Sequence, residues 1–475
     1  MIPKKAAHFM RQFSFAKLYQ EIKIGMHALY LAFMQIARRE IAFAYAGLQI
    51  LYLLLPSVKT KAQQMIVHYS SISIGTLPVA IIVTFACQLT DVKYMDIKVG
   101  EMIGLCLLPS LFIQKLSKNM FFMLFFFCFL FISGLCKSYF MDFVIPSGVG
   151  ALKQPYWIGI TRFIELLTCF SVVAFIVKHI QTRLQLNEFV HYFLLSNSVF
   201  AIIFILCYPI GKEIGFYYFD IHRLKGFFNE GGPLGTYFAF LFMLSHALSP
   251  KKTKIWFLLL FASIMFLAQS KASAIAVLAY FSIISISAIK SKLRKLAAII
   301  ALSILFVFAA LSIVDNYVEM FRELDITLRN GSEDPNIVAG RVSGVFISNN
   351  MMADNPIFGI GLGNYPLLRN NPAYLGQFPA LDVWDITGLG AIHTLLLECG
   401  IAGFMLLIYC LYRLRRETPE KAHFILIFCM PLFFGAHLHF HYPWIVIAIM
   451  QVTHKKSALP PPLKHFNAIK RIPLK

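Results

Sequence analysis

A-G-R-V-S-G, residues 339–344, is the first of three polar stretches that interrupt an otherwise apolar chain; the others are N-P-I-F-G-I-G-L-G-N-Y (355–365) and G-A-I-H-T-L-L-L-E-C-G-I-A-G (390–403). A backbone inside a bilayer must satisfy its own hydrogen bonds, so this much Gly, Pro and Asn belongs outside the hydrocarbon or in a cavity walled by protein. Arg341 offers a planar cation for phosphate oxygens, and His393 offers a base near neutral pH. Residues 339–403 are therefore the candidate active region.

The composition around this region is that of a membrane protein. Of the 475 residues 58% are hydrophobic, and the mean hydropathy is +0.69. Several apolar runs reach about 18 to 22 residues, which is long enough to cross a bilayer as a helix. We predict an all-α polytopic membrane protein with about 11–13 transmembrane helices and one large periplasmic loop. The expected segments are 41–56, 66–88, 98–114, 119–136, 157–177, 189–210, 233–248, 255–269, 272–289, 296–314, 392–412 and 423–452, the last as a hairpin.

These segments divide the chain into five parts. Residues 1–40 form a basic cytoplasmic segment in which 24–37 are expected to lie on the membrane as an amphipathic helix. A transmembrane bundle (41–314) and a large periplasmic loop (315–391) follow, and then C-terminal transmembrane helices (392–452) and a basic tail (453–475).

Basic residues fix the orientation of the second half. Three groups flank successive segments: Lys251, Lys252 and Lys254; Lys290, Lys292, Arg294 and Lys295; and Arg413, Arg415 and Arg416. The positive-inside rule makes these loops cytoplasmic. The lysine-free, acidic loop 315–391 should then lie on the opposite side, together with 211–232. Ten simple crossings before residue 315 would, however, place the basic N-terminus outside, so one early segment is miscounted.

Charge and cysteines exclude several other classes of protein. The formal net charge of +20 could indicate a nucleic-acid partner, but the basic residues flank apolar segments and do not form a single patch, which favours membrane anchoring. The nine cysteines have no C-x-x-C spacing, so neither a disulfide framework nor a zinc site is expected. His437, His439 and His441 alternate as ligands on a strand would, but the following Pro443 and Trp444 indicate a turn, so we interpret them as structural.

Within the candidate region, 340–353 are expected to form a short amphipathic helix that Asn355 and Pro356 end. The glycines of the G-x-G-x-G run permit a tight turn; a nucleotide site is disfavoured because no strand precedes them and no G-K-[ST] follows. His393 could instead simply cap the next helix. Glu398 lies five residues on, at about 100° per residue, and so off the face of His393.

A second polar stretch, H-R-L-K-G-F-F-N-E-G-G-P-L-G (222–235), precedes another membrane helix. Arg223 and Lys225 are cations beside flexible backbone, and Asn229 with Gly231 and Gly232 can present N–H groups near a helix start. They are expected on the same side as Arg341 and His393, although they could be ordinary membrane-flanking cations. Two arginines and a histidine on the same outer side of the membrane indicate a pyrophosphate site with a base beside it.

These stretches resemble the superfamily of O-antigen ligases and O-antigen polymerases. The resemblance covers about 220–415 and is carried by R-L-K-G-F-F-N-E-G-G-P-L-G (223–235), L-A-Q-S-K-A-S-A (267–274), G-R-V-S-G-V-F (340–346), N-P-I-F-G-I-G-L-G-N-Y and H-T-L-L-L-E-C-G-I-A-G (393–403). Lys271 replaces a more usual arginine, and Thr394 replaces a common asparagine.

The resemblance implies glycan transfer, with inversion, from undecaprenyl pyrophosphate at the periplasmic face of the bacterial inner membrane, without cofactor, nucleotide sugar or essential metal. Arg223, Lys225 and Arg341 would bind the pyrophosphate, and His393 would be the general base. Supporting roles would fall to Glu398, Asn229, Gly361 and Tyr365. The partners would be the lipid-linked oligosaccharide, membrane lipids, a chain-length regulator and a flippase.

Two alternatives remain open. The polymerase and ligase forms share these motifs, and we favour the polymerase, which extends a lipid-linked repeat, over the ligase, which uses lipid A core. A transporter or flippase would have as many helices, but it would normally show repeats and charged or broken segments at mid-membrane.

Overall fold

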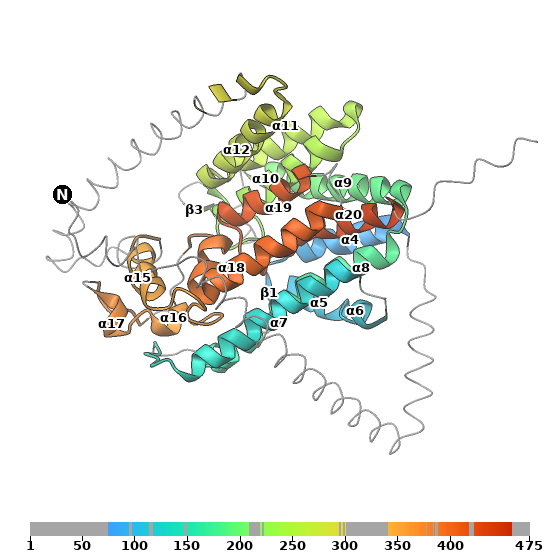
Figure 1. The fold of residues 1–475 in the computed structure, drawn as a ribbon. Helices are drawn as coiled ribbons and strands as arrows, with labels where there is room; N and C mark the ends of the chain where they lie inside the picture. Colours follow the sequence, from blue (N-terminus) through green and yellow to red (C-terminus); the bar gives the residue numbers. More distant parts are fainter. Residues whose placement is uncertain are drawn as a thin grey trace, which may run out of the picture. The chain divides into compact units, whose positions relative to one another are not determined.

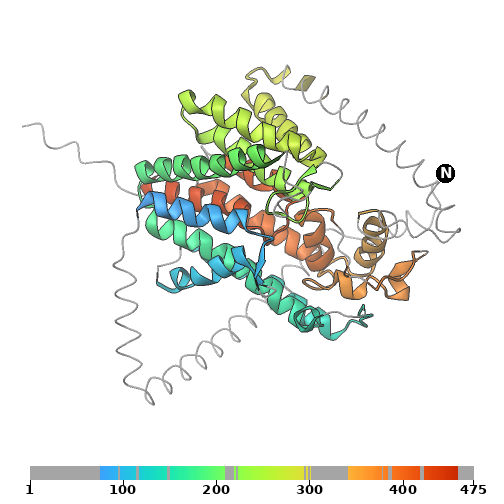
Figure 2. The ribbon, with the colours of Figure 1, turned by 180° about the vertical axis from the view of Figure 1, so that it is seen from behind.

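The computed structural model describes residues 75–457, except 95–96, 114–116, 147–149, 209–218, 221–222, 294–295, 298–299, 301–340, 377, 383, 385–387 and 418–421. Its longer helices are α4 (Thr76–Gln88), α5 (Val99–Cys106), α7 (Lys118–Tyr139), α8 (Trp157–His179), α9 (Arg183–Cys207), α10 (Gly231–Leu248), α11 (Lys251–Leu267), α12 (Lys271–Ala288), α15 (Arg341–Asp354), α18 (Ala391–Glu417), α19 (Ala422–Phe433) and α20 (His441–Ser457). Shorter ones are α6 (Pro109–Ile113), η1 (Ala151–Lys153), α16 (Tyr365–Leu368) and α17 (Pro372–Leu375). Figures 1 and 2 show them from two opposite sides.

The fold confirms the prediction of an all-α polytopic membrane protein. Five helices, α7, α8, α9, α12 and α18, are long and apolar enough to cross a bilayer. The described strands form only two antiparallel hairpins, of β1 (Lys93–Tyr94) with β2 (Ile97–Lys98) and of β3 (Phe219–Asp220) with β4 (Arg223–Leu224). The count of 11–13 spans and the five-part division include segments that lie wholly or partly outside the described residues, such as 41–56 and 296–314, so both stay predictions.

Two expected segments have a different form from a single helix. The segment 98–114 was expected as one span, but it contains α5 and α6, which both pack on α8. Residues 423–452 form the expected hairpin of α19 and α20. The break between α5 and α6 places Pro109 at the first position of α6, where its missing N–H costs no hydrogen bond.

Polar residues start several helices before their apolar runs begin. Ser117 accepts a hydrogen bond from the Met120 N–H (3.3 Å) at the start of α7. Thr182 and Gln185 form a capping box at the start of α9. Such caps satisfy backbone donors that would otherwise be left without partners, and they fix where each helix enters the bundle.

A buried amide ties three helices together in the core. Asn197 of α9 accepts hydrogen bonds from Gln88 Nε2 of α4 (2.9 Å) and from the Tyr237 hydroxyl of α10 (2.7 Å). Its own amide donates to the Phe193 carbonyl (2.8 Å). Between apolar helices in a membrane, such polar contacts specify which faces meet.

Helices α10 and α18 both begin at the turn 434–436, which follows α19. The Thr236 hydroxyl of α10 donates to the Phe434 carbonyl (3.4 Å), and the Ala391 N–H of α18 donates to the Ala436 carbonyl (2.8 Å). Both helices pack along α19 and end near basic residues, Lys251 after α10 and Arg415 in α18. We call the end of the bundle at 434–436 the turn end and the opposite end the basic end.

The early helices also fit this arrangement. Helix α7 starts at Ser117, whose hydroxyl donates to Gln451 (2.8 Å) near the end of α20, so it starts at the basic end. Helix α4 starts beside the first turns of α9, with Thr76 donating to Glu188 (3.3 Å). The described helices then alternate in direction from α4 onward, and the expected segment 41–56 lies outside the described residues.

The described half of the loop 315–391 is folded. Helix α15 runs from Arg341 to Asp354 and confirms the helix expected at 340–353. Both views show it with α16 and α17, in orange, near the start of α18 (Figures 1 and 2). Its apolar side chains form a separate small core of Ile347, Met351, Ile360, Tyr365, Leu368, Tyr374, Phe378 and Leu397. The last of these belongs to α18, so the loop is anchored on the membrane helix.

Candidate functional site

His393 is the third residue of α18 and is partly buried. Its Nε2 lies 3.1 Å from the Ser348 hydroxyl of α15, and Ser348 is fully buried. The imidazole therefore contacts a neighbouring helix. A histidine that capped α18 would instead bind a backbone group of α18 itself. Helix α15 is held against the first turn of α18 at this point.

Arg341 is the first residue of α15, and its side chain lies outside the description. It precedes Ser348 by seven positions, or about two turns of α15.

Helix α18 is broken at Gly400, where φ is 63° and ψ is −168°. The break frees backbone groups that the glycine-rich loop satisfies. Ile360 and Gly361 donate to the carbonyls of Leu397 and Glu398 (3.0 and 2.8 Å). In return, Ile401 and Ala402 donate to the carbonyls of Pro356 and Ile357, completing four hydrogen bonds (2.9 and 3.0 Å). We call this the loop–helix junction; it joins two of the three polar stretches that mark the sequence.

The G-x-G-x-G run makes the expected tight turn. Gly359, Gly361 and Gly363 have φ values of +66°, +97° and +79°. Gly361 donates its N–H at the junction, as above, and the Gly363 N–H donates to the Glu398 carboxylate. Tyr365 follows at the start of α16 and is 2% exposed. These two predicted supporting residues, Gly361 and Tyr365, therefore hold the loop on α18.

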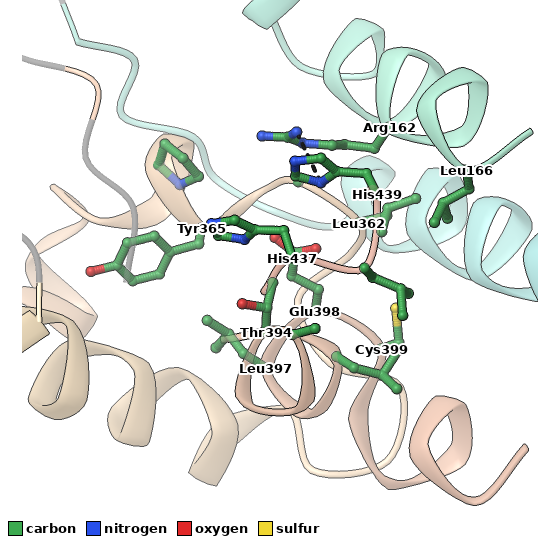
Figure 3. Close-up of a pocket in the computed structure, with 15 residues that line it drawn as sticks. Arg162, Leu166, Leu362, Tyr365, Thr394, Leu397, Glu398, Cys399, His437 and His439 are labelled. Atoms are coloured by element: carbon green, nitrogen blue, oxygen red, sulfur yellow. Dashed lines mark hydrogen bonds between the residues drawn. The ribbon is translucent and has the colours of Figure 1, made fainter. Parts of the chain in front are cut away.

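A cavity of about 70 Å³ lies on the other face of α18. It is lined by Thr394 and Glu398 of α18, Arg162 of α8, and His437 and His439 of the turn that leads to α20. Figure 3 shows Thr394 and Glu398 below the two imidazoles, with Arg162 beside His439. Glu398 is thus on a different face from His393, as the helical period predicted, and it lines a polar cavity.

Behind this cavity lies a cluster of partly buried charges. Arg162 pairs with Glu165 one turn further along α8 (2.6 Å), and Lys98 of β2 reaches both Glu165 (3.6 Å) and Glu101 (3.2 Å). Burial acts to lower the pKa of Lys98, but the two carboxylates outweigh it and raise this pKa, so the ammonium stays charged. The cluster joins α5 and the β1–β2 hairpin to α8.

The two histidines above the cluster are neutral. Their rings stack, with centroids 5.1 Å apart, and His439 Nδ1 lies 3.6 Å from Glu165. Burial lowers the pKa of His437 to about 4, and burial also lowers the pKa of His439 well below its usual value. Neutral imidazoles can both donate and accept hydrogen bonds in the cavity.

The sequence interpretation missed part of this arrangement. His437 and His439 were taken as structural residues at a turn; the turn is there, but both line the cavity. Arg162 and Glu165 were not singled out, although two opposite charges three positions apart inside an apolar segment are a known sign of a polar site in a membrane protein. Among the described residues no group of three or more His, Cys, Asp or Glu is placed to hold a metal ion.

Arg223 lies on β4, just before α10. Its Nε donates to the Ala268 carbonyl at the end of α11 (3.2 Å). Among the described residues, neither Nη group of Arg223 has a hydrogen-bond partner. A Cβ at Gly231 would lie 3.3 Å from Arg223 Nε and 2.8 Å from the Ala268 carbonyl oxygen. The absence of a side chain at Gly231 therefore leaves room for the contact between Arg223 and Ala268.

The other residues of this stretch have mixed roles. Lys225 is half-buried and its carbonyl accepts the Phe228 N–H (3.0 Å) in a turn. Asn229 was expected to present its N–H to an anion, but that N–H donates to the Asp91 carboxylate (3.1 Å). The binding role expected for the Asn229 backbone is therefore wrong for the structure as it stands.

The structure brings the two halves of the predicted site to the same end of the bundle. Arg223 precedes α10, and His393 begins α18, and both helices start at the turn 434–436. Arg341 begins α15, the helix whose Ser348 contacts His393. Lys225 lies beside Arg223 in sequence and fold, whereas Glu398 lines the separate cavity.

Residues 256–411 match the family model described as O-antigen ligase. The match begins in α11 and ends within α18, so it includes Arg341, Ser348, His393 and the loop–helix junction and leaves out Arg223. No curated protein matches the chain.

Proposed function

We propose that this chain, a member of the O-antigen ligase and polymerase superfamily through its match over residues 256–411, transfers glycan from a lipid-linked pyrophosphate to a sugar hydroxyl. The observation that carries the proposal is the contact of His393 with Ser348 (3.1 Å), which brings the helix that begins with Arg341 to the histidine. A base and a phosphate-binding cation then belong to one site.

The donor in this proposal is an undecaprenyl-pyrophosphate-linked oligosaccharide. Arg223 supports this donor. The Ala268 carbonyl accepts its Nε–H, and the planar guanidinium presents donors in a fork that fits two phosphate oxygens. Arg341, at the first position of α15, adds the positive end of a 14-residue helix to its own charge. Lys225 adds a further cation to the Arg223 side.

His393 is the general base of the reaction. It takes the proton of the acceptor hydroxyl while the hydroxyl oxygen attacks the anomeric carbon. The bond from that carbon to the pyrophosphate oxygen breaks, and the electron pair leaves with the pyrophosphate, where the arginines stabilise it. Attack opposite the leaving group inverts the anomeric configuration. This reaction needs neither nucleotide sugar nor metal.

The site faces the periplasm in this proposal. Helices α10 and α18 run from the turn end, with the candidate residues, to the basic end, with Lys251 and Arg415. The positive-inside rule assigns the basic end to the cytoplasm of a bacterial inner membrane. Lipid-linked glycan would therefore enter from the outer leaflet.

The product separates the two forms of the enzyme. We favour the polymerase, in which the acceptor is the sugar hydroxyl of another lipid-linked repeat, and keep the ligase, which joins polysaccharide to lipid A core. The test incubates purified protein in detergent with EDTA and an undecaprenyl-pyrophosphate-linked repeat, with and without lipid A core. A ladder from the repeat alone identifies a polymerase; a product that requires the core identifies a ligase.

His393→Gln decides whether the chemistry is as proposed. An amide is polar but not basic near pH 7, and a general base contributes about 10² to 10⁴ in rate. The variant should fold and bind donor but make little or no extended glycan. Ordinary ladders from His393→Gln, or a strict dependence on added metal, would contradict the mechanism.

A transporter is the second candidate, and two observations favour it. The break of α18 at Gly400 and the partly buried Arg162–Glu165 pair are features of transport proteins. The four hydrogen bonds of the junction, however, close the break with protein backbone. Proteoliposomes that move lipid-linked glycan across the bilayer without changing it would favour the transporter.

A further inference from the structure

The Ser348 hydroxyl has one hydrogen to donate and two neighbours within hydrogen-bond distance. It is 3.2 Å from the Val345 carbonyl of its own helix and 3.1 Å from His393 Nε2. Serines inside helices commonly donate to a carbonyl one turn back. If the hydrogen goes to Val345, the Ser348 oxygen accepts the N–H of His393 Nε2.

The other ring nitrogen supports the same assignment. His393 Nδ1 is buried and has no hydrogen-bond partner among the described residues. A neutral imidazole carries one proton, so Nδ1 holds either a bare lone pair or an N–H without a partner. Buried N–H groups without partners are rare in proteins, and an unfilled acceptor costs less.

We infer that Ser348 is a positioning residue that fixes His393 in the tautomer with the proton on Nε2, so that Nδ1 is the atom that takes the proton from the acceptor hydroxyl. This inference rests on the proposed role of His393 as base. When the acceptor O–H gives its proton to Nδ1, the imidazolium keeps its Nε2–H bond to Ser348. The hydroxyl oxygen that gave up the proton forms the new bond to the anomeric carbon, and the pyrophosphate leaves with the electron pair.

Among the described residues, Ser348 is the side chain placed to fix the tautomer of His393. Within the described ranges no charged side chain forms an ion pair or hydrogen bond with His393. Glu398 faces the cavity lined by Arg162 and His437, on another side of α18. Thr394, the next residue, donates its hydroxyl to the Gly390 carbonyl (2.9 Å).

The chain offers a matched control for Ser348 on the same helix. Ser343 is also fully buried, and its hydroxyl has no hydrogen-bond partner among the described residues. Ser343→Ala removes the same atom from an equally buried place on α15 without changing any contact with His393. Ser348→Thr keeps a hydroxyl and should recover part of the rate that Ser348→Ala loses.

The experiment measures kcat and KM across pH with the undecaprenyl-pyrophosphate-linked repeat in detergent. We expect Ser348→Ala to lower kcat about 10- to 100-fold, the usual effect of removing a partner that orients a functional histidine, with little change in KM. Ser343→Ala should match the wild type. In a His393→Gln background, Ser348→Ala should cause no further loss, because Ser348 acts through the histidine.

The direction in which the acid side of the pH profile moves distinguishes the two tautomers. If the Ser348 oxygen accepts from Nε2–H, it stabilises the imidazolium most, and its removal moves the acid limb to lower pH. If Ser348 instead donated to Nε2, its removal would move that limb to higher pH and overturn the inference. Equal kcat values for Ser348→Ala and Ser343→Ala would also overturn it, while His393→Gln would still report on the proposed function.

The tautomer can be observed without any reaction. Nitrogen NMR of protein labelled with ¹⁵N-histidine, compared with His393→Gln, identifies the signals of this ring. We expect a protonated Nε2 and an unprotonated Nδ1 near neutral pH, and the reversed pattern would contradict the inference even if the enzyme were active.

Discussion

Gly359 and Gly400 lie back to back where the glycine-rich loop meets the break in α18. A Cβ placed on Gly400 would be 2.7 Å from the backbone nitrogen of Gly359, and one placed on Gly359 would be 2.5 Å from the Cys399 nitrogen, the residue before Gly400. Backbone atoms this close cannot yield as a flexible side chain can. The loop–helix junction is therefore possible only because both residues lack a side chain.

Gly400→Ala should disrupt the junction. The control is Gly376→Ala, because Gly376 has nearly the same φ, 62° against 63°, but nothing within 4 Å of its Cβ position. Both alanines pay backbone strain of about 1–3 kcal/mol, and only Gly400→Ala adds the overlap with Ile357 and Gly359. Thermal unfolding in detergent should show a clearly larger loss for Gly400→Ala. Equal losses would mean that the junction adapts to a side chain.

Glu165→Gln should destabilise the protein strongly. It removes the carboxylate that lies 2.6 Å from Arg162 and 3.6 Å from Lys98, and it leaves two partly buried cations without their shared partner. Breaking a fully buried pair costs about 3–5 kcal/mol, and the partial exposure of these side chains makes the expected loss smaller than that. Glu188→Gln, at an exposed position where the carboxylate accepts only the Thr76 hydroxyl, is the control and should change the unfolding midpoint little. Similar midpoints for the two variants would show that the charge cluster adds no stability.

Arg341→Lys should lose most of the activity although it keeps the charge. An ammonium cannot reproduce the two parallel hydrogen bonds that a guanidinium makes with phosphate oxygens. Arg415→Lys makes the same exchange at an exposed position of the basic end and should leave polymer formation unchanged. Polymer yields from Arg341→Lys close to the wild type would show that Arg341 is only a membrane-flanking cation.

Asp382→Cys tests the orientation. Asp382 is exposed in the described part of the loop, and Arg415 is exposed at the basic end. In a background without the exposed Cys106 and Cys136, an impermeant maleimide added from the periplasm should label Asp382→Cys in intact cells. Arg415→Cys should react only after the membrane is disrupted. The reverse pattern would place the candidate site in the cytoplasm.

The sequence could predict those features that depend on local patterns. Apolar length predicted the helices, Asn355 and Pro356 predicted the end of α15, and glycine spacing predicted the tight turn. The helical period also separated Glu398 from the face of His393. Each of these follows from a few neighbouring residues.

Contacts between distant residues could not be predicted in this way. The partner of His393 is 45 positions earlier in the chain, and the partner of the Asn229 N–H is 138 positions earlier. The cavity joins α8 to a turn more than 250 residues later, so no short pattern contains it. The pair Arg162 and Glu165 was visible in the sequence, but its partners His439 and Lys98 were not.

The segment of α18 that carries His393 is clamped at both ends. At its start the Ala391 N–H is bound to Ala436, and at its break the carbonyls of Leu397 and Glu398 are bound to the loop. The backbone that carries His393 is therefore held on both sides, so the helix segment itself is not expected to shift when substrate binds. Any adjustment of the base toward an acceptor is left to the short histidine side chain, a travel of a few ångströms at most.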